Sequence, residues 1–131
     1  MAKTFMQMVQ EAKAEVPGIS PAEAHRRLKE DPDAILIDVR DALDIPASEI
    51  APYGVNVSLG MLPVRADLNV PAQARDPRLQ DRSRQIITTC KLGNLAAMGA
   101  RLLKEMGFTK VVFMEGGMQG WNEAGLPTRC K

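Results

Sequence analysis

Short apolar runs alternate with amphipathic segments along this chain. Four of these runs have the pattern of strands, and they lie at residues 34–37, 55–58, 85–89 and 110–114. Apolar residues at helical spacing predict helices at 3–16, 21–31 and 95–106, and a shorter helix from 116 to 121. Strand, helix and strand in this order imply right-handed crossovers, and therefore a mainly parallel sheet covered by helices.

Capping and turn residues define the ends of these elements. Ser20, Pro21 and Glu23 predict a helix start with a capping box, in which Ser20 is the N-cap and Glu23 the third helical residue. Gly107 is placed to close the helix that precedes the last strand. Prolines and glycines recur throughout residues 41–84, so we expect only a short strand and one or two helical turns in that part of the chain.

Composition indicates one globular domain. The 131 residues are 45% hydrophobic and 25% charged, which is enough apolar material for a core. The net charge of +1 gives no electrostatic reason to expect nucleic acid or an anionic membrane as a partner. Apolar runs are far shorter than the roughly 20 residues of a membrane span. Polar residues interrupt the apolar ones near the N-terminus, so we expect no signal-peptide core there. We therefore expect a cytoplasmic protein.

Cysteine and histidine are too few for a metal site or a disulfide scaffold. The chain has Cys90, Cys130 and His25, without CxxC or HExxH spacing, so no metal and no cofactor are expected. Cys130 lies one residue from the C-terminus and is predicted to be an exposed thiol. A disulfide between the two cysteines is not indicated in the cytoplasm.

Cys90 is the strongest candidate for chemistry. It lies between a predicted strand and a predicted helix, at the carboxyl end of a parallel strand, where sites form in such sheets. A turn at Gly93 would curl the backbone amides of residues 91–95 around the sulfur. The helix N-terminus, with Lys91 beside it, would favour the thiolate. A free cysteine often only fills space, but this context favours a reactive one.

Three segments together resemble a single rhodanese domain, and they are Ile35–Arg40, Ile86–Asn94 and Val111–Pro127. The resemblance is colinear from about residue 20 to 128 and leaves the first helix outside. We therefore expect an N-terminal helical extension at 1–18 and a rhodanese-like domain at 19–131. The implied fold is an α/β three-layer sandwich, a mainly parallel sheet of about five strands flanked by helices.

This resemblance implies sulfur transfer. Cys90 would take sulfane sulfur from thiosulfate or another persulfide, hold it as a persulfide, and pass it to cyanide or to a thiol acceptor, either a small molecule or a protein. The substrate-binding loop would consist of Lys91, Leu92, Gly93, Asn94 and Leu95. Asp38 and Arg40 resemble the strand-end pair that supports this loop. A purely structural ion pair or turn cap is the alternative interpretation.

The chain departs from the family pattern at the loop. Active rhodaneses of this type commonly show CxxGxR, whose arginine binds the donor's sulfonate, and the sixth position here is Leu95. A charge-assisted hydrogen bond is worth about 1.5 to 3 kcal/mol, so its absence predicts roughly 10- to 150-fold weaker use of thiosulfate. Lys91 could supply only a mobile charge in its place.

Two further departures concern neighbouring functions. Cysteine phosphatases use a CxxxxxR loop, whereas position 96 here is Ala96, which argues against phosphate esters as substrates. The family's Gly-His-Ile-Pro-Gly-Ala segment is absent, and residues 52–58 stand in its place, which implies a different donor pocket.

The alternative function is a non-catalytic rhodanese-like module that carries sulfur or binds a partner. The altered loop and the apolar face of the first helix motivate it. That face is predicted to dock either on the domain itself or on another chain.

Overall fold

The computed structural model describes residues 2–129 and contains one five-stranded sheet in which every strand pair is parallel. The order across the sheet is β1-β5-β4-β2-β3. The strands are β1 (Gly18–Ile19), β2 (Ile35–Asp38), β3 (Gly54–Asn56), β4 (Ile86–Thr89) and β5 (Val111–Met114). Cys130 lies outside the described residues, so its predicted exposure and pairing are not addressed by the fold.

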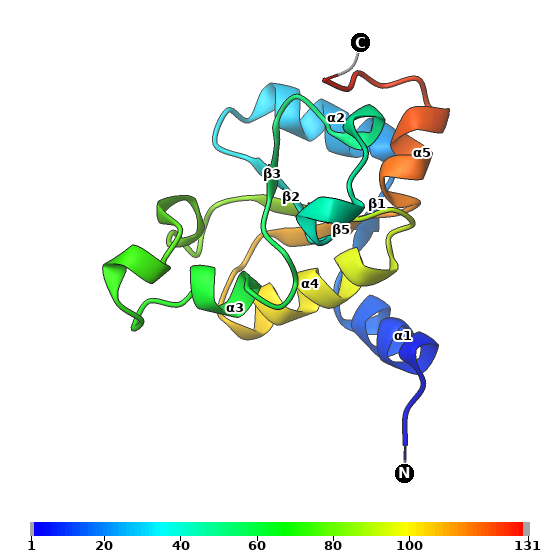
Figure 1. The fold of residues 1–131 in the computed structure, drawn as a ribbon. Coiled ribbons are helices and arrows are strands. Elements are labelled where there is room, and N and C mark those ends of the chain that lie inside the picture. The colour runs from blue at the N-terminus through cyan, green and yellow to red at the C-terminus, as the bar shows by residue number, and fades with distance from the viewer. Residues whose placement is uncertain (1, 130–131) are drawn as a thin grey trace.

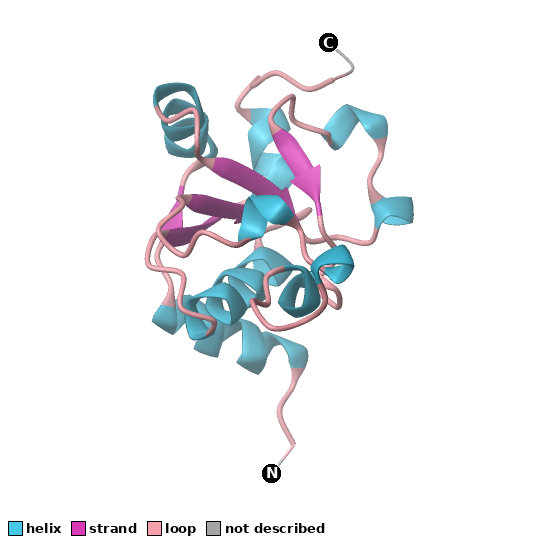
Figure 2. Ribbon diagram, turned by 90° about the vertical axis from the view of Figure 1, so that its left-hand side faces the viewer, coloured by secondary structure: helices cyan, strands magenta, loops and turns pink. Residues whose placement is uncertain are grey.

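Helices cover both faces of the sheet (Figure 1). They are α1 (Phe5–Glu15), α2 (Pro21–Glu30), α3 (Leu62–Arg65), α4 (Asn94–Glu105) and α5 (Gly117–Glu123). α1, α3 and α4 lie on one side, and α2 and α5 on the other, so that the strands form the middle layer seen in Figure 2. The predicted α/β three-layer architecture with a mainly parallel sheet is confirmed.

The central strands are apolar throughout because both of their faces are buried. Ile37 and Ile86 pack in the cluster under α4, whereas Leu36 and Ile87 pack in the cluster under α2 and α5. Successive side chains of a strand point to opposite faces, so an unbroken apolar run serves two cores at once. This is why the sequence pattern identifies β2, β4 and β5 to within a residue at each end.

The chain before β1 forms a helix that packs against α4. Thr4 caps α1 by accepting a hydrogen bond from the Gln7 amide. Val9 and Ala12 of this helix are fully buried. Phe5, an apolar residue of the helix predicted at 3–16, is nearly half exposed, because the contact with α4 uses a narrow stripe of the helix.

Two strands, and the number of helical turns in residues 41–84, differ from the sequence-based prediction. The predicted strand at 55–58 is instead β3 at Gly54–Asn56, and the chain between β2 and β3 forms two 3₁₀ turns at Ala42–Asp44 and Ala47–Glu49. β1 was not predicted, since its two residues become a strand only by pairing with β5. Further 3₁₀ turns lie at Ala72–Ala74 and Pro77–Leu79.

The start of α2 follows the prediction in one of its two halves. Ser20 accepts a hydrogen bond from the Glu23 amide, and Pro21 occupies the first helical position. The Glu23 carboxylate does not complete a capping box, because it accepts hydrogen bonds from Arg26 and Arg27. Within residues 2–129, no helix is long and apolar enough to cross a membrane.

Candidate functional site

The sulfur of Cys90 is met by two backbone amides. Cys90 directly follows β4, and its Sγ accepts hydrogen bonds from the Gly93 amide at 3.1 Å and the Ala96 amide at 3.3 Å. The residue is 3% exposed. Both donors belong to the turn and first turn of α4, so the partial positive charge of that helix end is directed at the sulfur. This arrangement favours negative charge on Sγ.

Glycine at position 93 makes this turn possible. Gly93 has φ of 97°, in the left-handed region, immediately before α4 begins. A Cβ there would lie 3.0 Å from the Met114 carbonyl oxygen and 3.2 Å from the Gly116 nitrogen. The loop therefore passes directly over the end of β5, a path that side chains at this position would obstruct.

The first turn of α5 holds the outer side of the loop. The Met118 amide donates to the Cys90 carbonyl at 2.7 Å, and the Gln119 amide donates to the Lys91 carbonyl at 3.0 Å. Gly117, with φ of 56°, allows this approach, because a Cβ there would lie 2.4 Å from the Cys90 carbonyl oxygen. The double glycine before α5 thus orients the cysteine backbone without touching the sulfur.

The predicted loop residues take different places. Gly93 donates to the sulfur, while Lys91 and Leu92 present exposed side chains. Asn94 accepts a hydrogen bond from the Lys13 ammonium of α1 at 3.4 Å. Leu95 is half-buried and packs against the core cluster under α4.

Ala96 was missed as a sulfur ligand, although its position carries a signal. It is the third residue of α4, and the first amides of a helix have no partner within the helix. Thr88 was missed as well. Its buried hydroxyl donates to the Ala96 carbonyl at 2.6 Å, which ties the first turn of α4 to β4 beside the cysteine.

Asp38 and Arg40 form a buried ion pair at the end of β2. Arg40 Nη2 lies 2.7 Å from Asp38 Oδ2, and Arg40 Nε also donates to that carboxylate. The Asn56 side chain donates to the carbonyls of both residues. Asn56 therefore holds the backbone of the pair where β2 leaves the sheet, next to β4, the strand that Cys90 follows.

Glu49 extends this pair into a network that reaches the cysteine loop. Arg40 Nη1 lies 2.6 Å from Glu49 Oε1, and Lys91 Nζ lies 3.6 Å from Glu49 Oε2. Glu49 was missed because it stands in a proline-rich stretch without periodicity, and only the fold brings it to the loop. Two cations and two carboxylates thus balance one another: Arg40, Lys91, Asp38 and Glu49.

Burial and charge oppose each other in this network. Burial would lower the pKa of the Arg40 guanidinium, but its hydrogen bonds to Asp38 and Glu49 outweigh burial and raise it. Burial would likewise raise the pKa of Glu49, but the hydrogen bond from Arg40 and the charges of Arg40 and Lys91 lower it. Both groups are therefore held in their charged forms.

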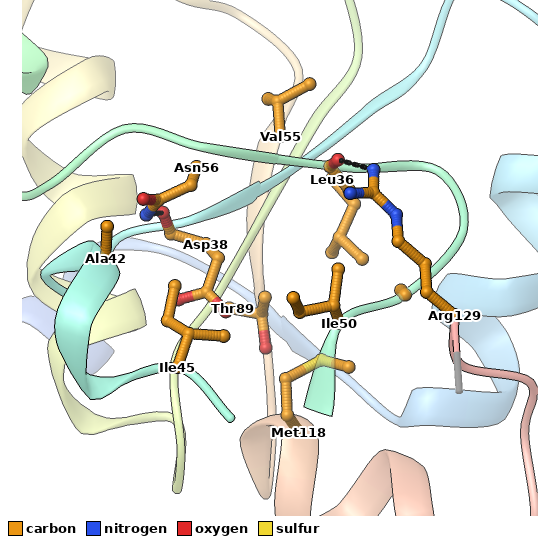
Figure 3. A pocket seen from close by; sticks show the side chains of 12 residues that line it. Leu36, Asp38, Ala42, Ile45, Ile50, Val55, Asn56, Thr89, Met118 and Arg129 are labelled. Carbon is orange, nitrogen blue, oxygen red and sulfur yellow. Dashed lines mark hydrogen bonds between the residues drawn. The ribbon is translucent and has the colours of Figure 1, made fainter. Parts of the chain in front are cut away.

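An apolar cavity of about 180 Å³ lies on the face of β4 opposite to α4 (Figure 3). Thr89 lines it, whereas the neighbouring Cys90 packs in the cluster under α4. Ile45 and Ile50, from the β2–β3 connection, point into the same space as Met118 of α5. The cavity is completed by Leu36, Asp38, Ala42, Ala51, Gly54, Val55, Asn56 and Arg129.

Comparison with known proteins places this geometry in a family. A model of the rhodanese-like domain matches residues 20–124. A sulfurtransferase of Allochromatium vinosum is 24% identical over 102 residues, which are 78% of this chain and 84% of that protein. The match covers β2, the cysteine loop and α5 alike.

Solved structures share the fold over nearly the whole chain. The polysulfide-sulfur transferase homodimer of Wolinella succinogenes superimposes with a TM-score of 0.74 at 33% identity, covering 95% of this chain and 85% of that one. A protein of unknown function from Rhodopseudomonas palustris, described as a possible tyrosine phosphatase, has a TM-score of 0.88 at 25% identity and covers 98% and 96%.

Proposed function

This chain belongs to the rhodanese-like domain family, and on that premise we propose that it transfers sulfane sulfur through a persulfide on Cys90. Two of the similar proteins are named as sulfur transferases. The observation that carries the proposal is the pair of amides, from Gly93 and Ala96, that converge on Cys90 Sγ. Such donors stabilise an anionic sulfur without moving during the reaction.

The proposed reaction has two displacements. In the first, the Cys90 thiolate attacks the outer sulfur of the donor, a new S–S bond forms, and the donor's S–S bond breaks. The leaving group departs with the electron pair, as sulfite from thiosulfate or as a thiolate from a persulfide. In the second, an acceptor thiolate attacks the terminal sulfur of the Cys90 persulfide, and the Cys90 thiolate leaves.

Neither step needs a general base, because the attacking group is already an anion and the leaving group, a thiolate or sulfite, departs as an anion. The one histidine of the chain, His25, hydrogen-bonds Tyr53 and stacks edge-on against Trp121 in the layer of α2 and α5. Cys90 instead belongs to the cluster under α4.

The loop favours a persulfide or polysulfide donor over thiosulfate. Leu95 occupies the position where an arginine would bind a sulfonate, and its side chain packs into the core. The similarity to the polysulfide-sulfur transferase of Wolinella succinogenes supports a donor of this kind. A small thiol or a protein thiol would be the acceptor.

Phosphatase chemistry is less well supported, despite the description of the Rhodopseudomonas palustris protein. Residues 91–96 contain no arginine, and the position that would hold a phosphate-binding guanidinium is Ala96. Lys91 is engaged with Glu49. A phosphate dianion in this loop would therefore meet amides but no bidentate cation.

The alternative, a non-catalytic module that carries sulfur or binds a partner, loses part of one of its two motives. α1 packs Val9 and Ala12 on α4, while Phe5 and Met6 remain nearly half exposed. The other motive, the altered loop at Leu95, is unaffected.

Mass spectrometry tests the proposal directly. The protein is incubated with an alkyl persulfide, with polysulfide or with thiosulfate, and the intact mass and the Cys90 peptide are measured. We expect one added sulfur on Cys90, its loss on addition of a thiol, and no turnover in Cys90→Ser. The matched control, Cys130→Ser, removes the other thiol and should keep full turnover. Absence of any sulfur adduct on Cys90, or equal turnover in Cys90→Ser, would refute the proposal.

A further inference from the structure

A fixed carboxylate and a mobile cation meet at the mouth of the cysteine loop. Lys91, the residue after Cys90, has a side chain that is 59% exposed, whereas the side chain of Glu49 is only 13% exposed. Arg40 holds one oxygen of Glu49, and the other oxygen lies toward Lys91. The Glu49 carboxylate is therefore fixed, and the lysine ammonium is drawn to it.

We propose that Glu49 is a specificity-determining residue, which pairs with Lys91 and so makes the cysteine loop select neutral or singly charged sulfur donors over the thiosulfate dianion. This inference rests on the proposed function and adds to it the electrostatic basis of donor choice. Without Glu49 to neutralise its charge, Lys91 would attract anions to Cys90.

Lys91 matters because the loop offers no other side-chain cation. From Cys90 to Leu95 the chain contains one basic residue, and that residue is Lys91. Arg40 is 6% exposed and bound on two sides by Asp38 and Glu49. The one cation that the loop itself carries is thus the one that Glu49 neutralises, while Lys13 of α1 lies at Asn94, at the other end of the loop.

The pair is better suited to specificity than to stability. An ion pair with one exposed partner contributes little to folding, since solvent screens it and ordering a lysine side chain costs entropy. A charge on the residue that follows Cys90, in contrast, acts on the approach of a charged reagent to that loop. Removing the Glu49 charge should therefore change selectivity while the fold persists, because glutamine retains an oxygen that can accept from Arg40.

Alkylation of Cys90 measures this selectivity without requiring sulfur transfer. Iodoacetate and iodoacetamide have nearly the same shape, but the first is an anion. With either reagent the thiolate forms a C–S bond, the C–I bond breaks, and iodide leaves with the electron pair. The ratio of the two rate constants at Cys90, measured in a Cys130→Ser background at low ionic strength, reports the local charge.

Glu49→Gln should raise the iodoacetate-to-iodoacetamide ratio about 3- to 10-fold, and added salt should diminish the rise. Adding Lys91→Met to Glu49→Gln should return the ratio to the starting value. Glu30→Gln, which removes an exposed carboxylate of α2, is the matched control and should leave the ratio unchanged. An unchanged ratio in Glu49→Gln, or a rise that survives Lys91→Met, would overturn the inference.

Sulfur transfer provides the second measurement. In Glu49→Gln, kcat/KM for thiosulfate relative to that for an uncharged alkyl persulfide should rise by a similar factor. Failure of every donor to place sulfur on Cys90 of the wild-type protein would remove the proposed function, while the alkylation ratio would still decide the role of Glu49. A wild-type protein that transfers sulfur, with an unchanged donor preference in Glu49→Gln, would contradict the Glu49 inference alone.

Discussion

The Met118 amide donates a 2.7 Å hydrogen bond to the Cys90 carbonyl oxygen, so the start of α5 fixes the backbone of the cysteine that follows β4. The sulfur and the carbonyl of one residue are consequently held by two different helices. α4 supplies the amide of Ala96 to Sγ, and α5 supplies the amide of Met118 to the oxygen. Displacing either helix start would break one of these two contacts to Cys90.

Gly117→Ala should misplace the loop. A Cβ at position 117 would lie 2.4 Å from the Cys90 carbonyl oxygen, and the φ of 56° adds a cost of about 1 to 2 kcal/mol for a residue other than glycine. We expect a roughly 10- to 100-fold slower formation of the Cys90 persulfide. Gly125→Ala is the matched control, because its φ is also positive but its Cβ would meet open space. Equal rates in the two variants would contradict this account.

Leu95→Arg should improve the use of thiosulfate. The substitution places a guanidinium at the sixth loop position, where a charge-assisted hydrogen bond to a sulfonate would raise kcat/KM for thiosulfate roughly 10- to 150-fold. Steady-state kinetics with thiosulfate and cyanide measures the change. Leu95→Gln provides a polar side chain without the charge and should give little gain. A folded Leu95→Arg protein with unimproved activity would show that the loop is limited by something other than the missing arginine.

Acid should weaken the protein partly through Glu49. Burial would raise the pKa of this carboxyl, and its contacts with Arg40 and Lys91 lower it instead from the ordinary value of 4.5. A carboxylate with a lowered folded pKa contributes stability that is complete above the unfolded pKa and is lost as pH falls through the folded pKa. Between pH 7 and about pH 3, the wild type should therefore lose more unfolding free energy than Glu49→Gln.

Urea denaturation followed by Trp121 fluorescence measures this difference. Trp121 is the one tryptophan of the chain and is fully buried, so its emission reports unfolding. Glu30→Gln should follow the wild-type pH dependence more closely than Glu49→Gln does, since Glu30 is exposed. Parallel pH dependences of the wild type and Glu49→Gln would exclude a contribution from Glu49.

Val9→Ala should destabilise the whole molecule. Val9 is fully buried where α1 packs on α4, and removing two buried methyl groups costs about 2 kcal/mol, including the cavity left behind. Met6 belongs to the same helix and is 46% exposed, so the stability of Met6→Ala should stay within about 0.5 kcal/mol of the wild type. A single unfolding transition, shifted only by Val9→Ala, would show that α1 unfolds together with the sheet. Equal stabilities would contradict the packing.

Sequence patterns predicted those parts of the fold whose causes are local. β2, β4 and β5 are buried on both faces, so their apolar runs are continuous and easily recognised. α2 carries its own cap in Ser20. β1 was not predictable in this way, because nothing in Gly18–Ile19 favours a strand until Phe113 and Met114 are beside it.

The candidate site divides along the same line. Cys90 and Gly93 could be selected from sequence because a strand, a cysteine, a turn and a helix follow one another directly. Glu49 and Thr88 could not, since each acts on a partner brought near only by tertiary folding. The Glu49 carboxylate meets Lys91 across two loops, and the Thr88 hydroxyl reaches the Ala96 carbonyl from an interior strand position.

The alternation of side chains at the end of β4 separates the cavity from the cysteine sulfur. Thr89 lines the apolar cavity, and the next residue, Cys90, places its sulfur under α4. The sheet therefore lies between the cavity and the Cys90 sulfur. Substitutions at Ile45 or Ile50 would therefore change the shape of the cavity while the Cys90 thiol keeps both of its amide donors. Mutagenesis can thus address the two regions independently.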